Sequence, residues 1–186
     1  MFYIVFGDDT SRIHQKVDVI KRKHKIQNIV RLDAMVQTQE EVLQEMDSIS
    51  IFDEAKMICL EHCTFLSSKN TTHYDIEPFL KRNGEDGYVL VLICESAKLD
   101  QRKKAVKQLM EISTVYSCIA LDEQSQRSYI QEHIKKEQLH MDADALRWFC
   151  QRVGLDAMRI DSEIYKLKTY GDVIHLEDVQ ALVTPE

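Results

Sequence analysis

Seven consecutive apolar residues, Tyr88-Val89-Leu90-Val91-Leu92-Ile93-Cys94, form the segment that most constrains how this chain can fold. The run does not alternate between apolar and polar residues, as a strand with one face in solvent would. A strand without alternation is covered on both faces, which is typical of the centre of a parallel sheet flanked by helices. The segment therefore predicts an α/β fold.

Shorter apolar runs lie on both sides of this segment, and amphipathic stretches separate them. Ile13, Val17 and Ile20 recur at helical spacing after the first run, and residues 99–112 show the same spacing before the last. Alternating strands and helices predict a parallel sheet with right-handed crossovers. The predicted strands are 2–6, 28–32, 57–60, 88–94 and 115–121.

The pattern changes after Leu121, where only helical periodicity remains. The predicted helices there are 125–138, 142–153, 157–170 and 176–183. The sequence therefore predicts an α/β domain over residues 1–122, followed by a small all-helical domain over residues 123–186.

Composition and charge narrow the class of protein. The net charge of −7 argues against a protein that coats nucleic acid. The basic clusters 21–25 and 102–104 fall on predicted helices, where a solvated face is the simpler interpretation. No leader peptide is expected, because the chain begins directly with a strand, and no apolar run is long enough to cross a membrane. We expect a cytoplasmic protein with reduced thiols and no membrane contact; its dispersed cysteines are Cys59, Cys63, Cys94, Cys118 and Cys150.

Residues Gly7-Asp8-Asp9-Thr10 follow the first strand, where a nucleotide-binding domain would carry its phosphate loop. A working loop is glycine-rich and ends in a lysine that holds phosphate oxygens. Here Gly7 stands alone, no lysine follows, and two carboxylates would repel a polyphosphate. We therefore predict that one of these polar residues caps the first helix and that no nucleotide cofactor binds.

The sequence gives little support for a metal site, a catalytic nucleophile or an aromatic stacking platform. Cys59, His62 and Cys63 are the closest group of metal-ligand types, but the Cys-x₂-Cys spacing of structural zinc sites does not occur. No serine or cysteine has the sequence context of an activated nucleophile. The aromatic pair Trp148-Phe149 fits the core of a helical domain better than a stacking platform. We expect no catalytic residue and no metal ligand.

Three segments carry a resemblance to a known family. The layout of an α/β domain followed by helices resembles AAA+ proteins, and residues 48–60, 96–104 and 153–167 are similar to corresponding segments of the bacterial DNA polymerase III delta subunit. The first segment contains Ser50-Ile51-Phe52, which resembles the family's Ser-Leu-Phe element with isoleucine in place of leucine.

The resemblance implies an AAA+-like parallel five-stranded sheet flanked by helices, and a helical lid. It also implies that Ile49, Ile51 and Phe52 bind a ring-shaped sliding clamp, whereas from the residues alone they could simply close the core before a strand. The implied partners are the clamp (the beta subunit) and, within a clamp loader, the ATPase subunits and delta prime. The resemblance implies contact with DNA only as part of that complex. The family's third, collar domain would follow Glu186. Such a subunit is a non-catalytic component of the DNA polymerase III holoenzyme in DNA replication.

Two alternatives remain open at this point. One is a divergent P-loop ATPase or nucleotide kinase. The loop after Gly7 disfavours this alternative, because it lacks the lysine and carries two carboxylates. The other is an AAA+-like adaptor that binds a different protein through Ile51 and Phe52.

Overall fold

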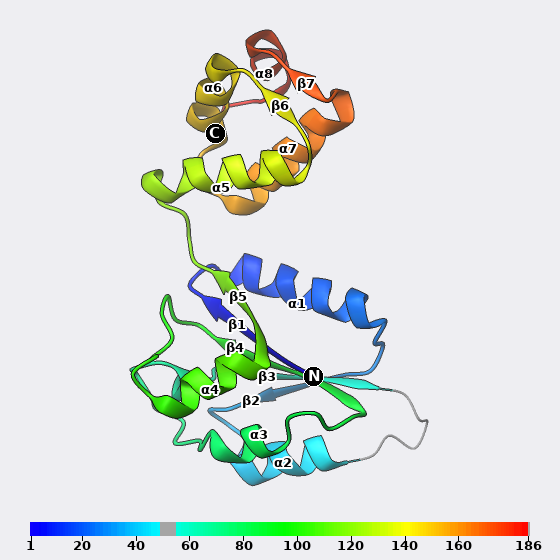
Figure 1. The fold of residues 1–186 in the computed structure, drawn as a ribbon, viewed down its shortest axis with the longest axis vertical. Coiled ribbons are helices and arrows are strands. Elements are labelled where there is room, and N and C mark those ends of the chain that lie inside the picture. The colour runs from blue at the N-terminus through cyan, green and yellow to red at the C-terminus, as the bar shows by residue number, and fades with distance from the viewer. Residues whose placement is uncertain (49–54, 186) are drawn as a thin grey trace. The chain divides into compact units, whose positions relative to one another are not determined.

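The structure, a computed structural model, describes residues 1–48 and 55–185. Its N-terminal part is built on a parallel sheet of five strands in the order β2-β3-β4-β1-β5 (Figure 1). The predicted parallel five-stranded sheet is therefore confirmed. The strands are β1 (Phe2–Gly7), β2 (Ile29–Asp33), β3 (Lys56–Glu61), β4 (Tyr88–Cys94) and β5 (Ser113–Cys118).

Strand β4 occupies the middle of the sheet, as its apolar run predicts. It pairs with β3 on one side and with β1 on the other, and all seven of its residues are buried. Alternate residues of the neighbouring strand β1 enter different cores: Phe2 and Ile4 face one side of the sheet, Tyr3 and Val5 the other. Both faces are therefore dry, which is why the strand sequences do not alternate.

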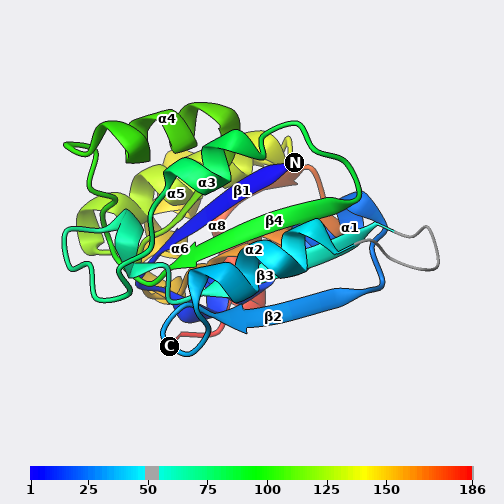
Figure 2. The same ribbon diagram turned by 90° about the horizontal axis from the view of Figure 1, so that it is seen from below.

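Helices cover the two faces of the sheet unequally (Figure 2). Helix α1 (Thr10–His24) covers one face alone and buries Ile13, Val17 and Ile20 against it. The other face is covered by α2 (Gln39–Asp47), α3 (Glu77–Lys81) and α4 (Lys104–Ile112). A 3₁₀ turn, η1 (Thr64–Leu66), follows β3 and adds Phe65 and Leu66 to the core on this second face.

Two predicted elements, the helix 99–112 and the strand 115–121, have wrong boundaries. The helix expected over 99–112 begins only at Lys104, because Leu99 is buried in the core while the Asp100 amide donates to the Leu66 carbonyl at 2.8 Å. The Asp100 carboxylate also accepts from Arg102, and local bonds of this kind compete with a helix. The strand expected over 115–121 begins earlier, at Ser113, which lies opposite Phe2 of β1, and it already ends at Cys118.

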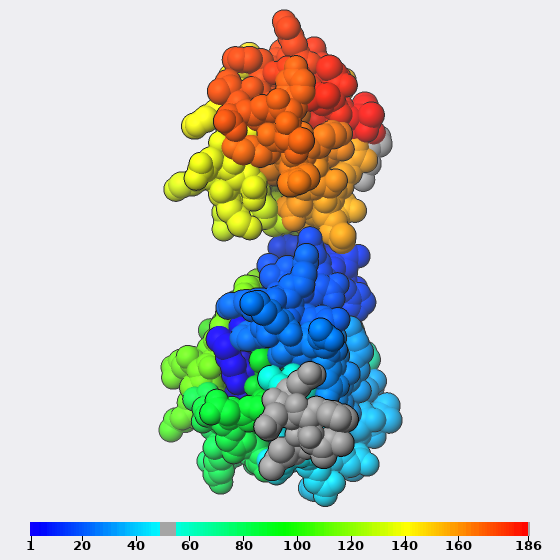
Figure 3. Space-filling view, turned by 90° about the vertical axis from the view of Figure 1, so that its right-hand side faces the viewer, coloured from blue at the N-terminus to red at the C-terminus, as the bar shows by residue number. Residues whose placement is uncertain are grey.

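The C-terminal residues form helices around a separate core that contains Ile130, Phe149, Ile160 and Leu167. The helices are α5 (Glu123–Lys136), α6 (Ala143–Val153), α7 (Ala157–Tyr170), seen in orange in Figure 3, and α8 (Leu176–Leu182). The expectation of helices alone was wrong in one detail, since β6 (His140–Met141) pairs in parallel with β7 (Val173–Ile174). Strands of two residues are too short to produce a recognisable period in the sequence.

The chain divides into two compact units, Met1–Ile119 and Ala120–Glu186. The sequence predicts two domains, over residues 1–122 and 123–186. Independent folding of the two units stays a prediction. In the part of the chain that the structure describes, no helix has both the length and the apolar character needed to cross a bilayer.

Candidate functional sites at the two edges of the sheet

The connection from β1 to α1 occupies the place of a phosphate loop, and it is very short. Only Asp8 and Asp9 separate Gly7, the last residue of β1, from Thr10, the first residue of α1. The Asp9 side chain accepts a hydrogen bond from the Arg12 amide at 3.0 Å and so caps the helix. One of the helix amides that could bind a phosphate oxygen is therefore satisfied by the protein's own carboxylate. The predicted cap is confirmed, and Asp9 is the residue that provides it.

Gly7 is required by the neighbouring strand rather than by a ligand. Its φ is +154°, and a β-carbon placed on it would lie 1.9 Å from the carbonyl oxygen of Cys118 in β5. The same carbonyl accepts a hydrogen bond from the Asp9 amide at 3.0 Å. The backbone of the connection is thus held directly against β5, and no residue with a side chain fits at position 7 without displacing that strand.

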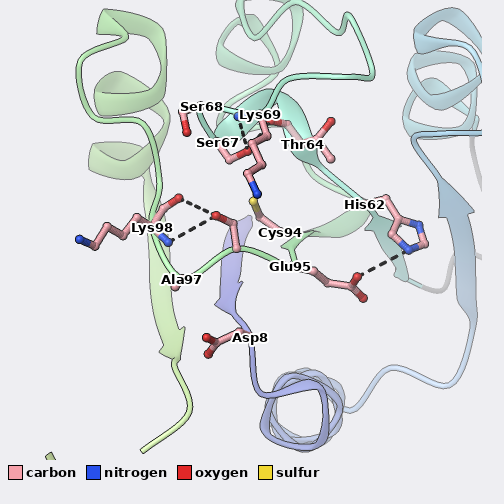
Figure 4. Close-up of a pocket in the computed structure, with 11 residues that line it drawn as sticks. Asp8, His62, Thr64, Ser67, Ser68, Lys69, Cys94, Glu95, Ala97 and Lys98 are labelled. Atoms are coloured by element: carbon pink, nitrogen blue, oxygen red, sulfur yellow. Dashed lines mark hydrogen bonds and ion pairs between the residues drawn. The ribbon is translucent and has the colours of Figure 1, made fainter. Parts of the chain in front are cut away.

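A pocket of about 500 Å³ opens at the carboxyl edge of the sheet, where ligands of open α/β folds usually bind (Figure 4). Asp8 follows β1, His62 follows β3 and Glu95 follows β4, so three neighbouring strands each place one titratable side chain at this edge. The Lys69 side chain reaches into the pocket from the loop after η1. The remaining lining residues are Thr64, Ser67, Ser68, Cys94, Ser96, Ala97 and Lys98.

His62 joins two strand ends at this edge. Its Nδ1 lies 2.9 Å from Asp33 Oδ1, and its Nε2 lies 3.7 Å from Glu95 Oε2. The close contact with Asp33 raises the pKa of His62, and the charges of Glu95 and Glu61 add to this, against the opposing effect of desolvation. Desolvation alone would raise the pKa of Asp33, but the Met35 amide and His62 together lower it. The imidazolium and the carboxylate therefore stabilise one another.

We expect the His62 contact to make stability depend on pH. The folded-state pKa of His62 is raised, so its contribution is fully present below the ordinary histidine pKa and is lost as the pH rises through the folded value. Both side chains are about one-third exposed, which limits the effect to less than ~1 kcal/mol after solvent screening. Urea unfolding of wild type and His62→Asn checks this, since asparagine tolerates the positive φ of 53° at this position. The stability difference should be larger at pH 5.5 than at pH 8.5, and an equal difference at both would contradict the assignment.

The charges in the pocket do not favour a polyphosphate. The carboxylates of Asp8 and Glu95 line it with Lys69, the Lys98 ammonium points away from it in Figure 4, and His62 is paired with Asp33, so no excess of positive charge is available. Among residues 1–48 and 55–185, no group of three or more histidine, cysteine or acidic side chains is arranged to hold a metal ion. The two carboxylates of the pocket would therefore repel a polyphosphate.

Cys59, Cys63 and Cys94 are candidate metal ligands or nucleophiles by residue type, but they lie inside the cores on the two faces of the sheet. Cys59 packs on the α1 side of the sheet and Cys63 on the opposite side, so they do not converge on His62. Burial raises the pKa of the Cys59 thiol to about 11, raises that of Cys94 to about 11, and holds that of Cys63 well above its usual range. These thiols stay protonated at neutral pH and behave as small apolar side chains.

The predicted clamp-binding residues Ile49, Ile51 and Phe52 lie outside the described residues. The chain on either side of them is described, and it lies at the amino edge of β3, the opposite edge of the sheet from the pocket. Helix α2 ends at Asp47, whose carboxylate binds the Arg82 guanidinium through a fork, with Nε–Oδ1 at 2.8 Å and Nη2–Oδ2 at 2.7 Å. The hydrogen bonds from Arg82 lower the pKa of Asp47.

Lys56, the first residue of β3, is a feature that the sequence did not reveal. Its side chain is buried although it carries a charge, and its ammonium group contacts Glu45 and Ser48 at the end of α2. A lysine placed between an acidic stretch and an apolar strand looks like an ordinary solvated residue. Only the path of the chain, which returns β3 to the end of α2, identifies its partners.

The basic clusters and the aromatic pair Trp148-Phe149, which the sequence also singled out, make contacts within the fold. The basic residues 21–24 form the last turn of α1, where positive charge complements the helix dipole, and both Lys23 and His24 contact the Tyr3 hydroxyl. Phe149 is buried in the C-terminal core as expected, while the Arg152 guanidinium stacks 5.0 Å from the centre of the Trp148 ring. Of residues 102–104, only Lys104 lies on α4.

The family described as "DNA polymerase III, delta subunit" matches residues 3–119. No curated protein sequence matches the chain.

Among solved structures, the DNA clamp loader delta protein (YqeN) of Bacillus subtilis is similar at a TM-score of 0.83 and 20% sequence identity. The alignment covers 100% of this chain and 58% of that protein, so the chain spans less than two thirds of the protein it matches. Two weaker likenesses are RuvB of Thermotoga maritima (TM-score 0.42, 8% identity, 97% of this chain and 60% of that one) and domain III of the Thermotoga maritima DnaA protein (TM-score 0.39, 13% identity, 99% and 85%).

Proposed function

The chain belongs to the DNA polymerase III delta subunit family, and we propose that it binds the ring-shaped sliding clamp and holds it open for loading onto primed DNA. The family match, which spans the segment with Ile49, Ile51 and Phe52 and all of the sheet except Phe2, is the observation that carries this proposal. The fold shared with the Bacillus subtilis clamp loader delta protein supports it.

We place the contact with the clamp at Ile49, Ile51 and Phe52. Two aliphatic side chains and one aromatic ring are suited to fill an apolar pocket on a partner, and such anchors dominate the energy of many interfaces. Each anchor of this kind typically contributes about 2 kcal/mol or more when it is fully buried. Direct binding of the 186-residue chain to the purified sliding clamp tests the proposal, and an absence of binding would contradict it.

Opening a ring requires no catalytic residue. A ligand shifts an equilibrium only through its different affinity for the two states, so the subunit must bind the open clamp interface more tightly than the closed one. We assign the hydrolysis of ATP to the ATPase subunits of the loader, which together with delta prime complete the complex. The chain would contact DNA only within that complex, and would act in the cytoplasm as a non-catalytic component of the DNA polymerase III holoenzyme.

We expect no saturable binding of nucleotide. Asp9 fills the amide site at the start of α1, Gly7 is packed against β5, and the adjoining pocket carries two carboxylates. A fluorescent ATP analogue titrated with Mg²⁺ up to about 1 mM should therefore give no saturation, whereas enzyme KM values typically lie between about 1 μM and 1 mM. The ATPase subunits of a clamp loader serve as the positive control. Saturable binding at micromolar nucleotide would restore the alternative of a divergent ATPase or nucleotide kinase.

A further inference from the structure

We propose that Lys56 is a positioning residue, which fixes both ends of the segment 49–54 so that it can engage its partner. This inference rests on the proposed function, because it takes the same segment as the contact with the clamp. It concerns only described residues: Glu45 and Ser48 before the segment, and Lys56 after it.

Among the residues that the structure describes, the oxygen atoms around the Lys56 ammonium group belong to the end of α2. Its Nζ lies 2.8 Å from Glu45 Oε1 and 2.9 Å from the Ser48 carbonyl oxygen, and it also contacts the Glu45 carbonyl and the Ser48 hydroxyl. Lys56 as a whole is 4% exposed, so these contacts replace its water shell. A buried ammonium needs such a complete set of acceptors, because an unpaired buried charge is strongly unfavourable.

The Lys56 charge also stabilises the C-terminal end of α2. The carbonyl groups at the end of α2 carry the negative end of the helix dipole, and the last turn of α2 contains no basic residue of its own. Lys56 supplies that positive charge from another element. The lysine therefore stabilises the helix end only when β3 begins beside it, which couples the two flanks of the segment.

A second contact holds the same helix end. Arg82, just after α3, binds Asp47 through the fork described above, and the adjacent Ser48 carbonyl is held by Lys56. The Lys56 amide also donates to the Gly87 carbonyl just before β4, at 3.1 Å. The residues on both sides of the segment are thus fixed to each other and to the sheet.

Fixing the ends of a segment lowers the conformational entropy that it must lose when it binds. We therefore expect Lys56→Met to weaken binding of the sliding clamp about tenfold in fully folded protein, which corresponds to about 1.4 kcal/mol. Methionine keeps the unbranched shape of lysine but removes the ammonium group. Lys56→Arg keeps the positive charge and should recover much of the affinity.

Lys103→Met provides a matched control. The Lys103 Nζ also binds backbone carbonyls, those of Phe65 within η1 and Ser67 just after it, at 3.3 and 2.9 Å, and neither belongs to the residues that flank the segment. Both methionine variants should lower the urea midpoint. Only Lys56→Met should raise the Kd for the clamp, measured by calorimetry at a temperature where circular dichroism shows all variants fully folded.

The outcomes separate this inference from the proposed function. If Phe52→Ala weakens clamp binding but Lys56→Met binds like wild type, the positioning role is wrong and the function stands. If neither wild type nor any variant binds the clamp, the proposed function fails. If Lys103→Met weakens binding as much as Lys56→Met, the effect reflects general stability and the positioning role is contradicted.

Discussion

Gly7→Ala is expected to destabilise the N-terminal unit by ~3 kcal/mol or more, because overpacking of this kind adds to the strain of a positive φ at an alanine. The new β-carbon would lie 1.9 Å from the Cys118 carbonyl oxygen and 2.2 Å from its carbon, so β1 and β5 would have to separate at their carboxyl ends. Domains are stable by about 5–15 kcal/mol, so this loss would remove a large share of the stability of a marginally stable domain and lower its urea midpoint. Urea unfolding followed by circular dichroism measures the loss.

Two other glycines provide graded controls. Gly84 has a φ of +89°, but nothing lies within 4 Å of a β-carbon placed on it, so Gly84→Ala should cost about 1 kcal/mol from strain alone. Gly171 has an extended φ of −178° and its nearest contact is at 3.8 Å, so Gly171→Ala should be within about 1 kcal/mol of wild type. A cost at Gly7 no larger than that at Gly84 would show that the contact with β5 is not what requires glycine there.

The reason for Gly7 illustrates what the sequence could not provide. A lone glycine after the first strand indicated a phosphate loop that had lost its ligand. The glycine is instead required by a contact with Cys118, which lies far along the chain and becomes its neighbour only when β5 pairs with β1. The role of Asp9 was more accessible, because helix caps depend on residues adjacent in the sequence.

The sheet itself could be predicted because its signal is local. The unbroken apolar run 88–94 identifies a strand with two dry faces, and the structure places β4 between β1 and β3. The start of α4 was predicted too early because the burial of Leu99 and the bond from the Asp100 amide to Leu66 are tertiary effects. Lys56 was missed for the same reason, since its partners are the carbonyl groups of a helix that the chain has already left.

Replacing Ile51 and Phe52 together is expected to have the largest effect on function. If these side chains fill an apolar pocket on the clamp, Ile51→Ala/Phe52→Ala removes both anchors while leaving the described core unchanged. Truncation of a buried anchor typically costs about 2 kcal/mol or more, so the double variant should bind at least about 100-fold more weakly. The two losses need not add, because neighbouring anchors commonly share one pocket.

Met35 and Val36 offer a matched control for this variant. They are also adjacent apolar residues, 64% and 74% exposed, but they follow β2 at the carboxyl edge of the sheet. Met35→Ala/Val36→Ala removes a comparable amount of apolar surface without touching the proposed contact. It should leave the affinity for the clamp unchanged.

Calorimetric titration with the purified sliding clamp measures whether this chain binds the clamp through Ile51 and Phe52. Wild type and Met35→Ala/Val36→Ala should both show saturable binding. Ile51→Ala/Phe52→Ala should give a Kd at least about 100-fold higher, with an unchanged circular dichroism spectrum. Equal affinity of the double variant and wild type, or no binding by wild type, would rule out this contact.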